Sequence, residues 1–104
     1  MTTADPILRK FRAALTDLYG DRIERVVLYG SRARGDAKPD SDYDIALFLK
    51  GLSDRWHEVR RIVAVEHALR DETGADIHTL PFPAESWRDR TPLMHEIRKD
   101  GLDL

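Results

Sequence analysis

Two short runs of β-branched and aromatic residues, 25–29 and 42–49, constrain the fold of this chain most strongly. The first run, Arg25-Val-Val-Leu-Tyr29, stops at Gly30 and predicts a buried strand. The second alternates between two faces and predicts another strand. Tyr, Ile, Leu and Leu lie on one of its faces, and Asp42, Asp44, Ala and Phe lie on the other.

Helix signals surround these strands. Asp5-Pro6 predicts a helix that ends at Gly20, and Ser31 to Gly35 predicts one short helical segment before turn residues 36–41. A helix capped by Ser53 is expected to run to about Glu72, and a strand is expected over 75–80, where Pro81 and Pro83 break it. The last helix is expected from Thr91-Pro92 to near Gly101, followed by a docked tail through Leu102 and Leu104.

This element order predicts an α/β (α+β) sandwich in a single domain over residues 1–104. The net charge of −2 provides no general basic field for nucleic acid, so we expect no sequence-specific nucleic-acid binding. The chain has no cysteine for a disulfide or a Cys-based zinc site. Residues 1–5 lack a secretory pattern, and no apolar run approaches the roughly 20 residues of a membrane span, so we expect a cytoplasmic protein.

The junction Leu28-Tyr29-Gly30-Ser31 is a candidate phosphate-binding turn. A strand that leads through glycine into a helix presents backbone N–H groups to an anion, and glycine lets the ligand approach the backbone closely. The hydroxyl of Ser31 adds a donor, and the nearby Arg32 and Arg34 are expected to neutralise phosphate charge. An ordinary turn explains this junction equally well when it is considered alone.

Asp42 and Asp44 are candidate ligands for a divalent cation. Two aspartates one residue apart on a strand share a face, with Cα atoms about 6–7 Å apart. Their mutual repulsion and desolvation are relieved by Mg²⁺, which prefers carboxylates together with phosphate oxygens and water. Two unrelated surface charges are the alternative, but the apolar residues around Asp44 disfavour an unpaired carboxylate there.

Asp76 is a candidate third carboxylate, because it starts a strand that could lie beside 42–49. A simple turn aspartate is its competing interpretation, and His78, on the same face, is expected to be a packed core histidine. Three carboxylates beside a Gly-Ser turn suit nucleotidyl transfer with two metal ions. In that reaction Asp76 would orient or deprotonate the attacking hydroxyl.

The combination Gly30-Ser31, ten residues, then Asp42-x-Asp44 resembles the signature of the DNA polymerase β-like nucleotidyltransferase superfamily. The fuller stretch over 28–49 resembles its minimal nucleotidyltransferase (MNT) proteins in particular. The resemblance implies a small mixed sheet flanked by helices, ATP as substrate, and phosphate contacts from Gly30 and Ser31. It also implies magnesium held by Asp42 and Asp44, with Asp76 matching a third carboxylate that some members lack.

The same resemblance implies a partner. MNT proteins pair with HEPN-domain ribonuclease toxins and act as antitoxins by transferring AMP from ATP to a toxin tyrosine. We expect no acceptor-holding domain in a chain of 104 residues, which fits an acceptor that is itself a protein. Two alternatives stay open at this point. One is a non-catalytic antitoxin that binds through apolar residues such as Trp56, Trp87 and Met94, and the other is transfer to a small molecule such as an aminoglycoside.

Overall fold

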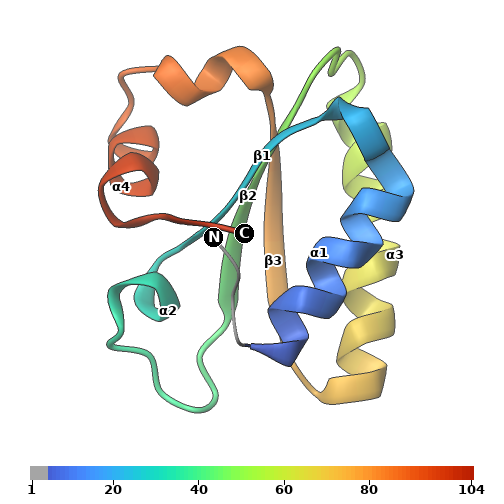
Figure 1. Cartoon of the computed structure of the whole chain (residues 1–104), viewed down its shortest axis with the longest axis vertical. Helices are drawn as coiled ribbons and strands as arrows, with labels where there is room; N and C mark the ends of the chain where they lie inside the picture. Colours follow the sequence, from blue (N-terminus) through green and yellow to red (C-terminus); the bar gives the residue numbers. More distant parts are fainter. Residues whose placement is uncertain (1–4) are drawn as a thin grey trace.

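A four-stranded mixed sheet forms the centre of the computed structural model, which describes residues 5–104 (Figure 1). Residues 1–4 lie outside the described residues. They are part of the domain expected over residues 1–104 and of the amino-terminal stretch that lacks a secretory pattern. The elements follow in the order α1 (Pro6–Tyr19), η1 (Gly20–Arg22), β1 (Ile23–Tyr29), α2 (Ser31–Arg34), β2 (Tyr43–Leu49), α3 (Arg55–Thr73), β3 (Ile77–Pro83), η2 (Ala84–Arg88), α4 (Pro92–Asp100) and β4 (Leu102–Asp103).

The strand order is β3-β2-β1-β4, and the sheet has helices on both faces. β1 pairs antiparallel with β2 and β4, whereas β2 and β3 are parallel. Helices α1 and α3 lie on one side of the sheet, and α2 and α4 lie on the other (Figure 1). The expected α/β architecture, a small mixed sheet flanked by helices, is therefore confirmed. Within residues 5–104, no helix is both long and apolar enough to cross a membrane.

The alternation of β2 divides the core into two parts, as the sequence predicts. Tyr43, Ile45, Leu47 and Leu49 pack toward α1 and α3 in the larger cluster, which also contains Phe11, Leu15 and Ile62. On the opposite face, Ala46 and Phe48 pack with residues of α4 in the smaller cluster. Asp44 is half-buried at one end of this second face. Asp44 of β2 thus lies on the side away from α1 and α3, and Asp42 immediately precedes the strand.

The third strand continues through both prolines, contrary to the expectation that Pro81 and Pro83 would end it at residue 80. β3 is an edge strand, and the Tyr43 N–H donates to the carbonyl of Asp76 at 2.9 Å. Even-numbered residues of β3 therefore point their backbone groups toward β2, and odd-numbered residues point theirs outward. A proline on the outward side of an edge strand loses no ladder hydrogen bond.

Two other expectations are corrected. Asp54, not Ser53, caps α3, because its carboxylate accepts from the His57 N–H at 3.1 Å. Of the apolar residues proposed for a binding surface, only Trp56 is strongly exposed, at 74%. Trp87 packs edge-on against Phe48, with ring centroids 5.5 Å apart, and Met94 is buried under α4. The packing of α4 and η2 against the sheet uses both of these side chains.

The carboxyl-terminal tail docks on the sheet, as expected. β4 pairs with β1 at Val27 and Leu28, and the Leu104 N–H donates to the carbonyl of Val26 at 2.9 Å. Gly101 makes the turn from α4 into β4 with very little space. A Cβ at this position would lie 2.2 Å from the Ile97 carbonyl oxygen and 2.4 Å from Cγ1 of Val27. The absence of a side chain at Gly101 therefore permits the close approach of α4 to β1.

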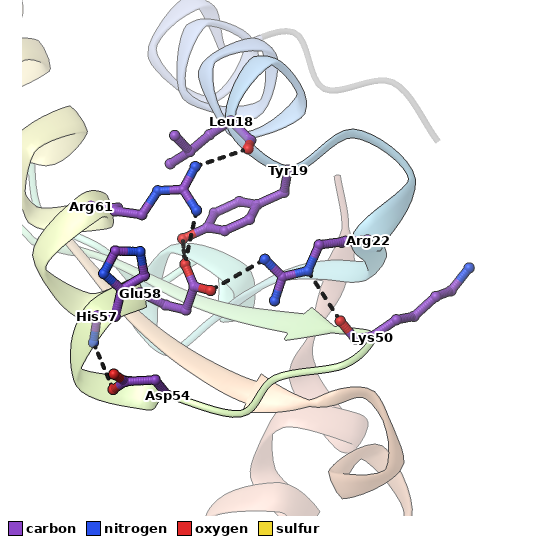
Figure 2. Close-up of polar contacts among 8 residues, drawn as sticks. All are labelled: Leu18, Tyr19, Arg22, Lys50, Asp54, His57, Glu58 and Arg61. Atoms are coloured by element: carbon purple, nitrogen blue, oxygen red, sulfur yellow. Dashed lines mark hydrogen bonds and ion pairs between the residues drawn. The ribbon is translucent and has the colours of Figure 1, made fainter.

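A buried carboxylate, Glu58, joins α3 to α1 and η1 (Figure 2). It accepts hydrogen bonds from the Tyr19 hydroxyl at 2.9 Å, from Arg22 at 3.2 Å and from Arg61 at 3.3 Å. Arg61 also donates to the carbonyl of Leu18. Burial opposes ionisation of Glu58, but these hydrogen bonds and the two arginine charges outweigh it, and the pKa of Glu58 is lowered. The cluster fixes the two helices that support β2.

Candidate active site

The site is built where β1 ends and β2 begins. Gly30 follows β1 with φ of +75°, a conformation that disfavours other residues, and Ser31 starts α2. The carbonyl of Gly30 accepts from the N–H groups of Ala33 and Arg34, both at 3.1 Å, which closes the short helix. The turn expected at Gly30-Ser31 is therefore present in the fold.

Gly30 and Asp44 lie directly against each other. Tyr29 pairs with Asp44 in the antiparallel ladder, so the residue after the strand reaches the aspartate side chain. A Cβ at Gly30 would lie 2.5 Å from Oδ2 of Asp44, which leaves room for hydrogen only. The fold thus brings the glycine of the first half of the motif to the carboxylate of the second half.

Asp44 carries charge that its surroundings do not neutralise. Burial is the largest cause that raises its pKa, and the carboxylates of Asp42 and Glu96 add to this effect. His78 and Arg34 oppose it without cancelling it. A partly buried carboxylate with a raised pKa and a second carboxylate nearby is the environment in which a bound cation is most stabilising.

His78 is a site residue that the sequence placed wrongly. It is exposed, not packed in the core, because Ile77 is the residue of β3 that points into the larger cluster. His78 lies opposite Asp44 in the parallel ladder, and its Nε2 is 3.4 Å from Oδ2 of Asp42. The imidazole therefore adjoins both aspartates of the motif.

Asp76 lies at the same end of the sheet, immediately before β3. Its carbonyl accepts from the Tyr43 N–H, which places the backbone of Asp76 beside that of the motif. Its carboxylate forms an ion pair with Nε of Arg70 at 3.2 Å. Among residues 5–104, no three His, Asp or Glu side chains converge on one point as a ready metal cage. The metal-binding role of Asp76 stays a prediction.

The two arginines of α2 point to different places. Arg34 forms an exposed ion pair with Asp36 at 3.3 Å, and its charge acts on Asp44. Arg32 instead donates to the carbonyls of Ser41 and Pro39. The expected phosphate role therefore suits the position of Arg34, whereas the guanidinium of Arg32 is engaged by the protein itself.

The charge of Glu96 acts on this site, although the sequence did not indicate this residue, and it also acts on Tyr29 of the expected turn. Burial, followed by the charges of Asp44 and Glu96, raises the pKa of Tyr29 to about 12. Glu96 comes from α4, and its distance to Asp44 depends on how α4 crosses the sheet. No local spacing encodes that packing, so no sequence pattern could have identified Glu96.

Comparison with known proteins supports the nucleotidyltransferase function that the motif resemblance implies. Residues 8–99 match the family model described as a nucleotidyltransferase domain. The chain is 36% identical over 98 residues to a candidate protein adenylyltransferase of Methanocaldococcus jannaschii, a match that covers 94% of this chain and 95% of the relative.

Solved structures share the fold. One is a toxin–antitoxin with AMP-PNP, with TM-score 0.60 and 19% identity, covering 89% of this chain and 68% of the other. Another is a tri-AMPylated Shewanella oneidensis HEPN toxin in complex with an MNT antitoxin, with TM-score 0.53 and 15% identity, covering 93% and 70%. The match over residues 8–99 and the M. jannaschii relative show that the chain belongs to the nucleotidyltransferase domain family and is a transferase enzyme.

Proposed function

We propose that this chain is a magnesium-dependent protein adenylyltransferase. ATP binds with its phosphates at Gly30 and Ser31, and Arg34 contributes positive charge. The observation that supports this proposal is the contact between Gly30 and Asp44, because the turn that we propose binds phosphate lies next to a carboxylate that we propose holds magnesium.

The residues of the site suit magnesium, although they do not form a complete cage. Asp42 and Asp44 offer hard oxygen ligands on one strand face, Asp76 lies at the neighbouring strand, and the remaining positions would be filled by phosphate oxygens and water. Burial and the acidic neighbours destabilise the ionised carboxylate of Asp44, so a bound cation would be stabilising there. Two such ions would polarise the phosphoryl group and neutralise the charge that develops on it.

The chemistry is displacement at the α-phosphorus of ATP. A hydroxyl oxygen of the acceptor forms a bond to this phosphorus, the bond to the bridging oxygen breaks, and pyrophosphate leaves. The hydroxyl proton passes to a nearby carboxylate or to water, and Asp76 is our candidate for orienting that hydroxyl. The side chains mainly hold charged groups in line, as is typical of phosphoryl-group transfer.

We propose that the acceptor is a tyrosine of a cognate HEPN-family toxin and that its modification neutralises the toxin. Support comes from the structural neighbours, one of which is an MNT antitoxin with a tri-AMPylated HEPN toxin. The M. jannaschii relative, a candidate protein adenylyltransferase, points to a protein acceptor as well.

The test first looks for a HEPN-family gene beside the gene of this chain, and then combines this chain, the HEPN protein found there and ATP labelled at the α-phosphate. We expect magnesium-dependent labelling of the HEPN protein and loss of its ribonuclease activity. The variant with Asp42→Asn and Asp44→Asn should abolish both effects. If this variant neutralises the toxin as well as the wild type does, binding alone is the mechanism. Label on an aminoglycoside, with none on the HEPN protein, would instead identify a small-molecule transferase.

A further inference from the structure

Arg32 connects the two halves of the site. It belongs to α2, which starts directly after the Gly30 turn, and its guanidinium reaches across to the segment that leads into β2. Nε and Nη2 donate to the carbonyl of Ser41 at 2.9 and 2.7 Å, and Nη2 also donates to the carbonyl of Pro39 at 3.2 Å. Ser41 immediately precedes Asp42, so these bonds hold the backbone at the start of the Asp-x-Asp motif.

The same guanidinium holds the residue between the two aspartates. Its Cζ lies 4.0 Å from the centroid of the Tyr43 ring, the distance of a close cation–π contact. Tyr43 is buried on the α1 side, where its hydroxyl donates to Oδ2 of Asp5 at 2.8 Å. Because neighbouring side chains on a strand point to opposite faces, holding Tyr43 on one face keeps Asp42 and Asp44 on the other.

The segment held by Arg32 has its own internal turn. The Ser41 N–H donates to the carbonyl of Lys38 at 3.0 Å, and the Ser41 hydroxyl accepts from the Lys38 N–H at 2.8 Å. On the α2 side, the Asp36 N–H donates to the carbonyl of Ser31 at 3.1 Å. Arg32 therefore closes a loop that is already tied down at both of its ends.

We infer that Arg32 is a positioning residue, whose bonds to Ser41 and Pro39 and stacking on Tyr43 set the two aspartates relative to the Gly30-Ser31 turn. This inference rests on the proposed function and changes the expected role of Arg32, which does not contact phosphate. Its planar fork is used for two carbonyls and a ring face, which a lysine ammonium cannot reproduce. Arg34 remains the cation for phosphate, a role that a lysine can partly fill as a point charge.

The first measurement compares ATP affinity in three proteins: wild type, Arg32→Lys and Arg34→Lys. With magnesium present, Arg32→Lys should bind ATP roughly tenfold more weakly, the effect of losing hydrogen bonds made by a charged donor. With chelator present, its affinity should equal that of the wild type, because only the metal-binding aspartates have moved. Arg34→Lys should lose affinity by a similar factor with and without magnesium, because we place Arg34 beside the phosphates and a lysine fills that role only partly. Arg32→Gln should behave as Arg32→Lys does.

The second measurement is amide hydrogen exchange over residues 35–44 in the protein without ligands. Arg32→Lys should speed exchange in this segment severalfold and leave β1 and α3 unchanged, whereas Arg34→Lys should have no effect there. This readout needs no nucleotide. If the wild type fails to bind ATP, the proposed function falls, and the exchange experiment still decides whether Arg32 holds the loop.

Three results would overturn the inference. Near wild-type ATP affinity in Arg32→Lys would mean that charge, not geometry, is what matters at this position. An equal loss of affinity with and without magnesium would mean that Arg32 contacts phosphate directly. Unchanged exchange over 35–44 would mean that the loop is held without Arg32.

Discussion

Oδ2 of Asp44 lies where a side chain on Gly30 would begin, 2.5 Å from the position of an added Cβ. The two residues are fourteen positions apart in the sequence, and the antiparallel pairing of β1 with β2 brings them together. The fixed spacing of the motif therefore has a direct physical meaning, because the glycine provides the space that the aspartate occupies.

Gly30→Ala should abolish nucleotidyl transfer. The methyl group would collide with the Asp44 carboxylate, and a displacement of about 1 Å at a reacting site can cost roughly 10²-fold in rate. The positive φ adds about 1–2 kcal/mol of strain. Gly35→Ala is the matched control, since Gly35 also has a positive φ but no atom within 4 Å of the added Cβ. Thermal unfolding should show that both variants are destabilised, Gly30→Ala more strongly because of the collision, and AMP transfer should be lost only in Gly30→Ala. Equal activity in the two would contradict the proposed role of the contact.

Asp44→Asn should make the ligand-free protein more stable while it removes activity. The substitution eliminates a carboxylate whose pKa is raised by burial and by nearby acidic residues. The pKa of Asp44 in the folded state lies above its value in the unfolded state. The free energy of unfolding of the wild type should therefore fall as the pH rises from the unfolded-state pKa to the folded-state pKa, and Asp44→Asn should not show this fall.

Addition of magnesium and ATP should make the wild type more stable than Asp44→Asn, the reverse of their order without ligand. Magnesium and ATP at about 100 times the dissociation constant stabilise a protein that binds them by about 2.7 kcal/mol. Only the wild type should gain this stability in a thermal-shift assay. A ligand-free variant that melts below the wild type would show that Asp44 is stabilising without a cation.

Glu58→Gln should destabilise the fold by about 1.5–3 kcal/mol, because it removes a buried charge that accepts from Tyr19 and two arginines (Figure 2). The pKa of Glu58 is lowered in the folded state, so its contribution is present above the unfolded value of about 4.3 and is lost as pH falls through the folded pKa. Urea unfolding at neutral and acidic pH measures both effects.

The control for Glu58 is on the same helix. Glu72 pairs with Lys10 at the surface, where the two side chains are 57% and 53% exposed. Glu72→Gln should change stability by no more than about 0.5 kcal/mol, because exposed ion pairs contribute little. If Glu58→Gln and Glu72→Gln lowered the free energy of unfolding by similar amounts, the buried cluster around Glu58 would stabilise the fold no more than an exposed ion pair does.

Gly101→Ala should destabilise the protein by about 1–3 kcal/mol, although the φ of Gly101, −66°, is one that alanine adopts easily. The cause is overpacking, since the methyl group would meet the Ile97 carbonyl and the Val27 side chain. Hydrogen exchange should report loosening of β4 and of the end of α4. Wild-type stability in this variant would show that α4 can move away from β1 at little cost.

The sequence predicted those features that depend on local pattern. Alternation in 42–49 predicted which side chains of β2 face each layer, and the spacing from Gly30 to Asp44 indicated one site before any contact was known. The errors arose where tertiary position decides. Pro81 and Pro83 are strand breakers in the interior of a sheet, and they are tolerated in β3 only because this strand lies at the edge.

The site itself was predicted in part for the same reason. His78 was expected in the core, because a sequence does not reveal which face of an edge strand a helix covers. Arg32 and Arg34 look equivalent in the sequence. In the fold, Arg32 donates to the carbonyl of Ser41, whereas the charge of Arg34 acts on Asp44. Glu96 contributes through the packing of α4, which no nearby residue encodes.

The prolines of β3 also affect how this domain can meet other proteins. The outer side of β3 lacks N–H donors at two of its outward positions, and β4 on the opposite edge is only two residues long. An incoming strand would find few groups with which to continue the sheet, so fibre-like stacking of copies is disfavoured. The protein acceptor that we propose would therefore be recognised mainly through side chains and surface shape, because strand addition at either edge of the sheet is disfavoured.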